Sequence, residues 1–222
     1  TSFLLPAVNR RRPTSVRLEP MPLALKPPIK FPHHLANLSL KWRYFNASFV
    51  GAATQYQGIY HQRKEWVTEL SDAKLPRVQV GLISTDHNPL DHLFTEPKRY
   101  QHRFLGPGFY AALMVQSKLS LTPAGNAKWT YRHYESVQAG TVLVSTDLSD
   151  VDLLIPLPTQ ATIYVPDHAP VAPVIQSTLS TLHTFQPLVR QAQSQLNHYL
   201  THGYYDPQKP AAILAFLNLW NE

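Results

Sequence analysis

The segment Val115-Gln-Ser-Lys-Leu-Ser-Leu-Thr122 decides the fold that we expect for this chain. Apolar and polar residues alternate along it, and such alternation predicts a half-buried β-strand. The same alternation returns from Trp129 to Tyr134, after the turn-forming residues Pro-Ala-Gly-Asn at 123–126. Further short apolar runs, separated by turn residues, lie at 141–145, 151–155 and 161–165. This regular spacing predicts an antiparallel β-meander of four to five strands.

The segments on both sides of this meander carry apolar residues at other spacings. Downstream, apolar stripes at helical spacing occupy 174–185, 188–202 and 210–220, with Pro187 as an interruption and Gly203 at a helix end. Upstream, the pattern predicts strands at 38–50 and 77–84 and a helix at 52–70. We therefore expect residues 36–222 to form a single α+β domain, whose antiparallel sheet carries C-terminal helices.

Residues 1–35 are expected to form an extended N-terminal arm. Seven prolines in this segment remove backbone donors and favour extended conformations, which excludes a continuous helix. The first 50 residues hold eight of the 20 lysines and arginines but one of the 14 acidic residues, so the formal charge of +6 is the sum of +7 in this segment and −1 in the rest of the chain. Apolar residues recur between the prolines, whereas a solvated tail would lack them. We expect this basic, proline-rich arm to lie in a groove of another protein.

The composition excludes several classes of protein. The chain of 222 residues has no cysteine, which excludes disulfide scaffolds, thiolate metal sites and a cysteine nucleophile. Its longest apolar runs, 109–115 and 211–217, are far shorter than the ~18 residues of a membrane span. The sequence contains no Walker A, Gly-x-Gly-x-x-Gly or Gly-x-Ser-x-Gly motif. We therefore assign no catalytic residue and no cofactor.

Two groups of side chains could support chemistry but have simpler explanations. Asp147, Asp150 and Asp152 could act as general acid and base, yet a turn between strands also favours acidic residues. His198 and His202 lie four residues apart on an expected helix, and the loop from His87 to His102 holds more histidine and carboxylate side chains. Neither set has a known zinc spacing, so we assign no metal site. A metal-dependent hydrolase built on that loop is the third hypothesis.

Basic and aromatic residues are interleaved in two runs, Lys41-Trp-Arg-Tyr-Phe45 and Lys128-Trp-Thr-Tyr-Arg-His-Tyr134. Aromatic rings beside cations on a sheet are typical of platforms for single-stranded nucleic acid. Here the rings alternate with the cations, so a strand would place them on opposite faces, as a half-buried strand requires. The alternative hypothesis is an RNA-binding protein with its arm on phosphates. In that protein Trp42, Tyr44, Trp129 and Tyr131 would stack on bases.

The first 17 residues bear on location. They contain four arginines, several hydroxyl residues and no acidic residue, which is typical of organelle targeting sequences. We expect a mitochondrial protein or, if this segment is an ordinary basic tail, a cytoplasmic one. The sequence shows no signal peptide, so we do not expect a secreted protein.

The leading hypothesis is a non-catalytic structural subunit of a large mitochondrial assembly, such as a respiratory-chain complex, ATP synthase or the mitochondrial ribosome. Its partners would be other protein subunits, at the periphery of a membrane complex or in solution, without a transmembrane segment. The hypothesis rests on the arm, the missing active-site motifs and an expected last helix that is apolar around most of its circumference. The expected partner-binding residues are Phe3, Leu5, Arg10, Arg11, Arg12, Leu23, Ile29, Phe31, Phe216 and Trp220.

Overall fold

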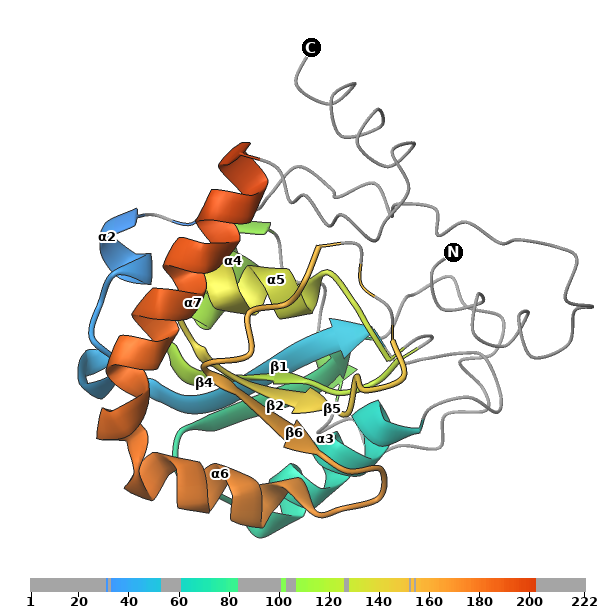
Figure 1. The fold of residues 1–222 in the computed structure, drawn as a ribbon. Coiled ribbons are helices and arrows are strands. Elements are labelled where there is room, and N and C mark those ends of the chain that lie inside the picture. The colour runs from blue at the N-terminus through green and yellow to red at the C-terminus, as the bar shows by residue number, and fades with distance from the viewer. Residues whose placement is uncertain are drawn as a thin grey trace, which may run out of the picture.

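The computed structural model describes residues 31, 33–52, 61–83, 101–102, 107–125, 128–151, 153 and 155–202. Within them, a central β-sheet is covered by helices on both faces (Figure 1). No helix in these ranges is long and apolar enough to cross a membrane.

The sheet has six strands in the order β3-β2-β1-β4-β5-β6, and all of its pairs are parallel. The strands are β1 (Phe45–Ala52), β2 (Val78–Ile83), β3 (Gln101–His102), β4 (Ser117–Thr122), β5 (Val142–Thr146) and β6 (Thr162–Val165). This is the order of the doubly wound α/β fold. The chain runs outward from β1 to β3, returns to β4 beside β1, and runs outward again. The strand order therefore reverses between β1 and β4.

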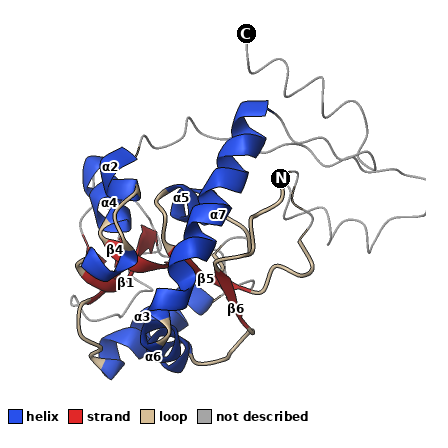
Figure 2. Cartoon of the chain, turned by 60° about the vertical axis from the view of Figure 1, so that its left-hand side comes forward, coloured by secondary structure: helices blue, strands red, loops and turns tan. Residues whose placement is uncertain are grey.

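The helices form two layers, one on each face of the sheet. They are α2 (His33–Ala36), the 3₁₀ turn η2 (Leu40–Trp42), α3 (Gln62–Ala73), α4 (Pro107–Val115), α5 (Arg132–Gln138), α6 (Val171–Ser180) and α7 (Leu182–His202). Figures 1 and 2 show α3 and α6 on one face of the sheet and α4 and α5 on the other. The long helix α7 passes from the side of α6 to the side of α5, where it packs against α5 and η2.

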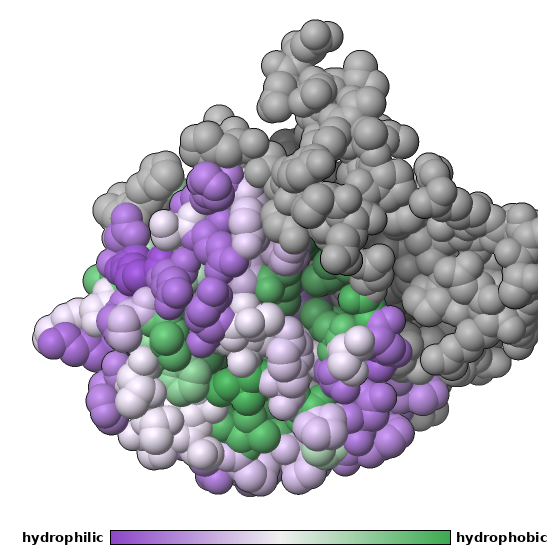
Figure 3. Space-filling model, viewed as in Figure 1, coloured by the Kyte–Doolittle hydropathy of each residue, from purple (hydrophilic) through white to green (hydrophobic). Residues whose placement is uncertain are grey.

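Helix α7 contacts segments that precede strands. Gln186 accepts hydrogen bonds from Leu40 N at 2.7 Å and from Ser39 Oγ at 3.1 Å, just before β1. Gln193 donates to the carbonyl of Gln138, just before β5. Figure 3 shows polar residues over much of the outer side of α7 and apolar residues where α6, α7 and β6 meet. Helix α7 therefore covers the amino ends of the strands and leaves their carboxyl ends to the loops.

A buried arginine completes this amino end. Arg43 precedes β1 and is 2 % exposed. Its guanidinium donates to the carbonyls of Ser117 (3.0 Å), Ala139 (3.0 Å) and Ala36 (3.2 Å). Burial, together with the charge of Arg190, lowers the pKa of Arg43 to about 10, so it stays charged at neutral pH. One side chain thus binds the backbone leading into β1, β4 and β5.

The expected antiparallel meander is wrong. Residues 128–131 form a loop and Arg132–Gln138 form α5, and the described residues between 151 and 155 lie in no strand. The alternating serines of β4 are buried rather than solvent-exposed. Ser117 Oγ donates to Leu113 O, and Ser120 Oγ bonds with Ser136 Oγ of α5 at 2.7 Å. Alternation here reflects polar contacts with helices that cover a parallel sheet, not one solvent-exposed face.

The expected arm 1–35 lies outside the described residues except for Phe31 and the start of α2. Phe31 packs against a small buried cluster made of Ala36, Met114, Val115 and Ala139. The larger core cluster includes β4 and β5 and is sealed by Val189, Ala192 and Leu196 of α7. The last expected helix, 210–220, lies outside the described residues.

Candidate functional site

The carboxyl ends of β1 and β4 form the point where the strand order reverses. The helices that follow these two strands, α3 and α5, lie on opposite faces of the sheet, and in folds of this kind that arrangement places a crevice at the carboxyl ends of the strands. In open parallel sheets ligands bind in that crevice. The side chains that reach it define the candidate site.

Two arginines meet at this point from opposite layers. Arg63 lies at the start of α3, and Arg132 is the first residue of α5. The Arg132 guanidinium donates to Val50 O at 2.5 Å and lies over the Phe49 ring at 4.7 Å. The Arg63 guanidinium lies 5.9 Å from the centre of the same ring. The buried ring of Phe49 therefore supports both cations.

The backbone after β4 approaches Arg63 closely. A Cβ atom at Gly125 would lie 2.4 Å from Cζ of Arg63, so only glycine leaves room for the guanidinium there. The preceding residue is fixed as well, because Ala124 N donates to Gln62 Oε1 at 2.7 Å. The loop after β4 is thus held against the first turn of α3.

The electrostatics of the pair favour an anion. Burial and then the charge of Arg132 lower the pKa of Arg63 to about 10, so Arg63 still carries its charge at neutral pH. An anion between the two guanidinium groups would relieve their mutual repulsion and accept hydrogen bonds from them. Phosphate oxygens match the planar, forked geometry of guanidinium groups.

Tyr110 connects the pair to an acidic residue. The Arg132 guanidinium lies 4.9 Å from the Tyr110 ring, and Tyr110 donates to Glu135 Oε2 at 2.7 Å. Burial raises the pKa of Tyr110, so its hydroxyl stays protonated and keeps this donor role. The Glu135 carboxylate is thereby oriented one turn along α5 from Arg132.

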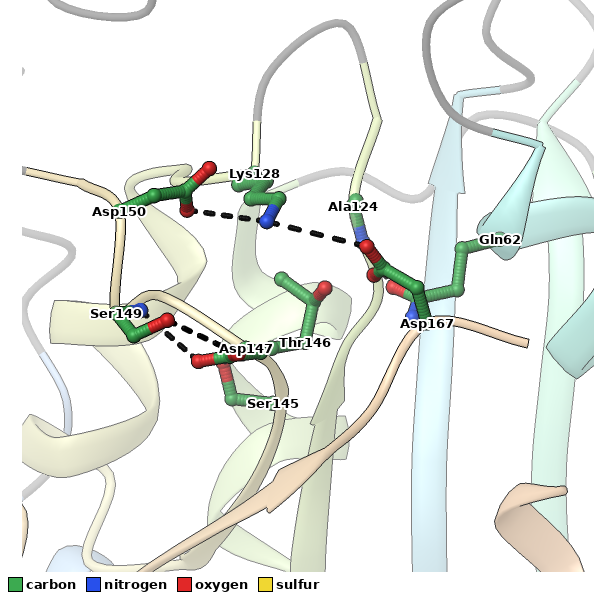
Figure 4. Close-up of polar contacts among 9 residues, drawn as sticks. All are labelled: Gln62, Ala124, Lys128, Ser145, Thr146, Asp147, Ser149, Asp150 and Asp167. Carbon is green, nitrogen blue, oxygen red and sulfur yellow. Dashed lines mark hydrogen bonds and ion pairs between the residues drawn. The ribbon is translucent and has the colours of Figure 1, made fainter. Parts of the chain in front are cut away.

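A second polar group lies at the carboxyl ends of β5 and β6 (Figure 4). Lys128 Nζ lies 3.0 Å from Asp150 Oδ1 and 3.9 Å from Asp167 Oδ2. The lysine side chain is 13 % exposed, whereas the two carboxylates are 50 % and 53 % exposed. These residues belong to the loops after β4, β5 and β6, so one ammonium ties three loops together.

The strand end below this group carries hydroxyl side chains. Ser145 donates to Thr146 O at 2.8 Å and lies 3.1 Å from Nε2 of the buried His133. Burial lowers the pKa of His133 to about 4, so the ring is neutral at physiological pH. The Thr146 hydroxyl is buried and has no hydrogen-bond partner among the described residues.

Asp147 lies in the next turn and makes the local hydrogen bonds that the turn interpretation predicts, while Asp152 lies outside the described residues. Asp147 accepts hydrogen bonds from Ser149 N at 2.9 Å and Ser149 Oγ at 3.0 Å. These bonds hold the pKa of the Asp147 carboxyl below its ordinary value. The sequence pointed to Asp147 and Asp150 as turn residues, and Asp150 also pairs with Lys128.

The four proposed stacking residues do not form one platform. Trp129 is 8 % exposed and packs edge to face with Tyr131 and Tyr134. Trp42 and Tyr44 are 71 % and 56 % exposed, but they precede β1. Trp129 and Tyr131 follow β4, which is parallel to β1, so the two pairs lie at opposite ends of the sheet.

The other predicted site residues cannot be placed. Among the partner-binding residues, Phe31 is described, while the following lie outside the described residues: Phe3, Leu5, Arg10, Arg11, Arg12, Leu23, Ile29, Phe216 and Trp220. Most of the 87–102 loop lies outside them too. The part of the chain that the structure describes contains no group of three or more potential metal ligands.

Arg63 and Arg132 were not predicted as site residues. Arg132 belongs to the expected strand from Trp129 to Tyr134, and Arg63 to the expected helix at 52–70. Their common signal is position, because each lies early in a helix that follows a strand. That signal carries meaning only once the strands are known to be parallel.

Comparison with solved structures agrees with the fold. The sucrose-phosphate synthase of Thermosynechococcus elongatus has 16% sequence identity and a TM-score of 0.57, over 100% of this chain and 56% of that one. TarM has 12% identity and a TM-score of 0.50, over 98% of this chain and 41% of that one. The chain thus spans about half the length of the structures it resembles. No protein-family model and no curated protein sequence matches it.

These likenesses overturn the leading hypothesis. The fold that runs through the chain is shared with a sucrose-phosphate synthase and with TarM, and neither likeness points to a non-catalytic structural subunit. Nothing found supports a respiratory-chain, ATP synthase or ribosomal assembly. The RNA-binding alternative fails on geometry, because Trp129 is buried far from the exposed Trp42.

Proposed function

We propose that this chain is the donor-binding part of a glycosyltransferase, which takes a sugar activated by a phosphate leaving group. The observation that carries the proposal is the pair Arg63 and Arg132 at the carboxyl ends of β1 and β4. The fold likeness to two glycosyltransferases supports the reaction class.

The arginine pair suits the chemistry of such a transfer. The bond between the anomeric carbon and the phosphate oxygen breaks, and its electron pair leaves with the phosphate. The acceptor oxygen bonds to the same carbon and gives its proton to a general base. Negative charge therefore grows on the phosphate in the transition state, where fixed guanidinium groups stabilise it most.

The same fold also serves dinucleotide-binding enzymes, but these hold pyrophosphate differently. Their first strand leads into a Gly-x-Gly-x-x-Gly loop, whose backbone N–H groups bind the pyrophosphate at a helix N-terminus. This sequence lacks that motif after β1 or elsewhere. Two half-buried side-chain cations in its place favour a phosphorylated sugar donor over a dinucleotide.

The match covers about half of each neighbour's chain, so we assign only the donor half of the reaction to these residues. The acceptor and the general base then belong to parts of the enzyme outside the described site. Donor binding, rather than sugar transfer, is therefore the activity that we expect of the described residues.

Calorimetric titration with inorganic pyrophosphate, UDP-glucose and GDP-mannose tests the proposal. Loss of one charge-assisted contact, ~1.5–3 kcal/mol, should weaken binding roughly 10- to 100-fold in Arg63→Ala and in Arg132→Ala. Arg77→Ala is the matched control, because Arg77 lies over the exposed Tyr44 ring at the amino end. Binding that is absent in the wild type, or equal in all four proteins, would overturn the proposal.

A further inference from the structure

The Thr146 hydroxyl is an unusual feature of the carboxyl edge. The side chain is fully buried at the end of β5, and its Oγ1 has no hydrogen-bond partner among the described residues. Buried hydroxyls in folded proteins nearly always have a partner. Ser145, one residue earlier, follows that rule, because it donates to Thr146 O and contacts His133. Thr146 therefore points to a partner that is not part of the described chain.

The surroundings of Thr146 identify the kind of partner. Figure 4 shows its side chain pointing from the strand end toward the Lys128 contacts with Asp150 and Asp167. Each carboxylate contacts Lys128 through one oxygen, and both are about half exposed. The group thus offers carboxylate acceptors, an ammonium donor and a hydroxyl that can do both.

The charge of this group differs from that of the arginine pair. Two carboxylates and one ammonium leave a net negative charge over β5 and β6, with Asp147 adding another carboxylate nearby. Arg63 and Arg132 place two positive charges over β1 and β4. A phosphate would be repelled by the acidic group over β5 and β6 and attracted by the arginine pair over β1 and β4. A neutral ligand group with several hydroxyls suits the acidic group over β5 and β6, since each hydroxyl both donates and accepts hydrogen bonds.

We propose that Thr146, Lys128, Asp150 and Asp167 form a subsite for a vicinal diol of a sugar. This inference rests on the proposed function, because it orients a sugar phosphate along the edge. The phosphate lies at Arg63 and Arg132, and the hydroxyl-bearing ring lies over the ends of β5 and β6. The diol donates to the second oxygens of Asp150 and Asp167 and accepts from Thr146 and Lys128.

Pairs of probes that differ by one hydroxyl test the subsite. Ribose 5-phosphate is compared with 2-deoxyribose 5-phosphate, and glucose 1-phosphate with its 2-deoxy and 4-deoxy analogues, by calorimetry. We expect at least one intact probe to bind roughly 5- to 10-fold more tightly than its deoxy analogue, as one or two hydrogen bonds imply. The ribose pair reports the sugar of a nucleotide, and the glucose set reports the transferred sugar.

Two variants connect this discrimination to the named residues. In Thr146→Val and in Asp150→Asn it should fall below about 2-fold, since each loses a hydrogen bond to the diol. Binding of inorganic pyrophosphate should stay unchanged in both. Equal affinity for intact and deoxy probes in the wild type, no binding of any probe, or full discrimination in Thr146→Val would each overturn the subsite.

Thr122→Val is the matched control. Thr122 is a buried threonine at the end of β4, but its Oγ1 donates to Val144 O at 3.2 Å. This variant should lower the unfolding temperature and keep the discrimination. Thr146→Val should keep the unfolding temperature, because it breaks no described hydrogen bond. If the wild type binds pyrophosphate but does not distinguish intact from deoxy probes, the subsite alone is rejected. If the wild type does not bind pyrophosphate, the proposed function is rejected.

Discussion

Glu69 of α3 holds the start of α6 through the backbone of Val171. Its Oε2 accepts the Val171 N–H at 2.9 Å, and its Oε1 accepts the Ala172 N–H at 2.8 Å. Both donors are among the first N–H groups of α6, which have no partner within the helix. A carboxylate also interacts favourably with the positive end of the helix dipole. The helix after β1 thereby fixes the helix after β6, on the same side of the sheet.

Replacing this cap should destabilise the fold. We expect Glu69→Ala to lower the free energy of unfolding by about 1–2 kcal/mol, the usual effect of losing an N-terminal cap. Urea denaturation measures it. Glu65→Ala is the control, because Glu65 faces an exposed His168 at 3.7 Å, and surface pairs of this kind contribute little. Equal losses in the two variants would contradict a specific capping role.

Gly125 should be required for the position of Arg63. In Gly125→Ala the new Cβ would displace the guanidinium, whose Cζ lies 2.4 Å from the place that this atom takes. We expect pyrophosphate affinity to fall about as much as in Arg63→Ala, in a protein that still folds. Gly108→Ala is the matched control, because a Cβ atom at Gly108 would have no other atom within 4 Å, and it should leave affinity unchanged. Wild-type affinity in Gly125→Ala would show that the close approach has no role in binding.

The buried His133 should make stability depend on pH. Its pKa is lowered from 6.5 to about 4 in the folded protein, chiefly by burial. Between these values the unfolded chain binds a proton that the folded chain does not, so stability is lost as pH falls from about 6.5 to about 4. The slope due to this residue is at most about 1.4 kcal/mol per pH unit. Denaturation of His133→Gln from pH 7 to pH 4 should show a shallower slope than the wild type, and an equal slope would assign the acid sensitivity elsewhere.

Replacing Arg43, which binds the backbone at the amino ends of β1, β4 and β5, should lower the stability of the fold. Arg43→Met keeps the apolar stem but leaves the carbonyls of Ser117, Ala139 and Ala36 without this donor. We expect a loss of about 3 kcal/mol or more, because several buried acceptors lose a hydrogen bond at once. Thermal denaturation measures it, with Arg77→Met, which removes an arginine stacked on the exposed Tyr44 ring, as the control. A variant as stable as the wild type would mean that water replaces the guanidinium.

The sequence was a good guide to local structure and a poor guide to topology. Strands were predicted close to the observed β2, β5 and β6, and helices close to α6 and α7, because periodicity is a local property. Whether strands pair in parallel depends on the connections between them. Trp129 to Tyr134 alternates as a strand does, yet Trp129 and Tyr134 pack together around the start of a short helix.

The candidate site was missed for the same reason. Arg63 and Arg132 are 69 positions apart in the sequence, and they come together only because β1 and β4 are neighbours. No local pattern distinguishes them from surface arginines. Asp147 and Asp150 were recognised as turn residues, since their local hydrogen bonds and spacing are visible in the sequence.

The burial of Trp129 has a practical consequence for ligand measurements. Trp129 follows Lys128 in the loop after β4 and packs against Tyr131 and Tyr134, whereas Trp42 is exposed to solvent at the opposite end of the sheet and Trp66 is buried in α3. Emission from an indole shifts with the polarity and order of its surroundings. A ligand bound at the carboxyl edge would therefore be expected to change the emission of the buried Trp129 more than that of the exposed Trp42. Comparing the wild type with Trp129→Phe during titration would isolate the contribution of this indole from those of the other three tryptophans.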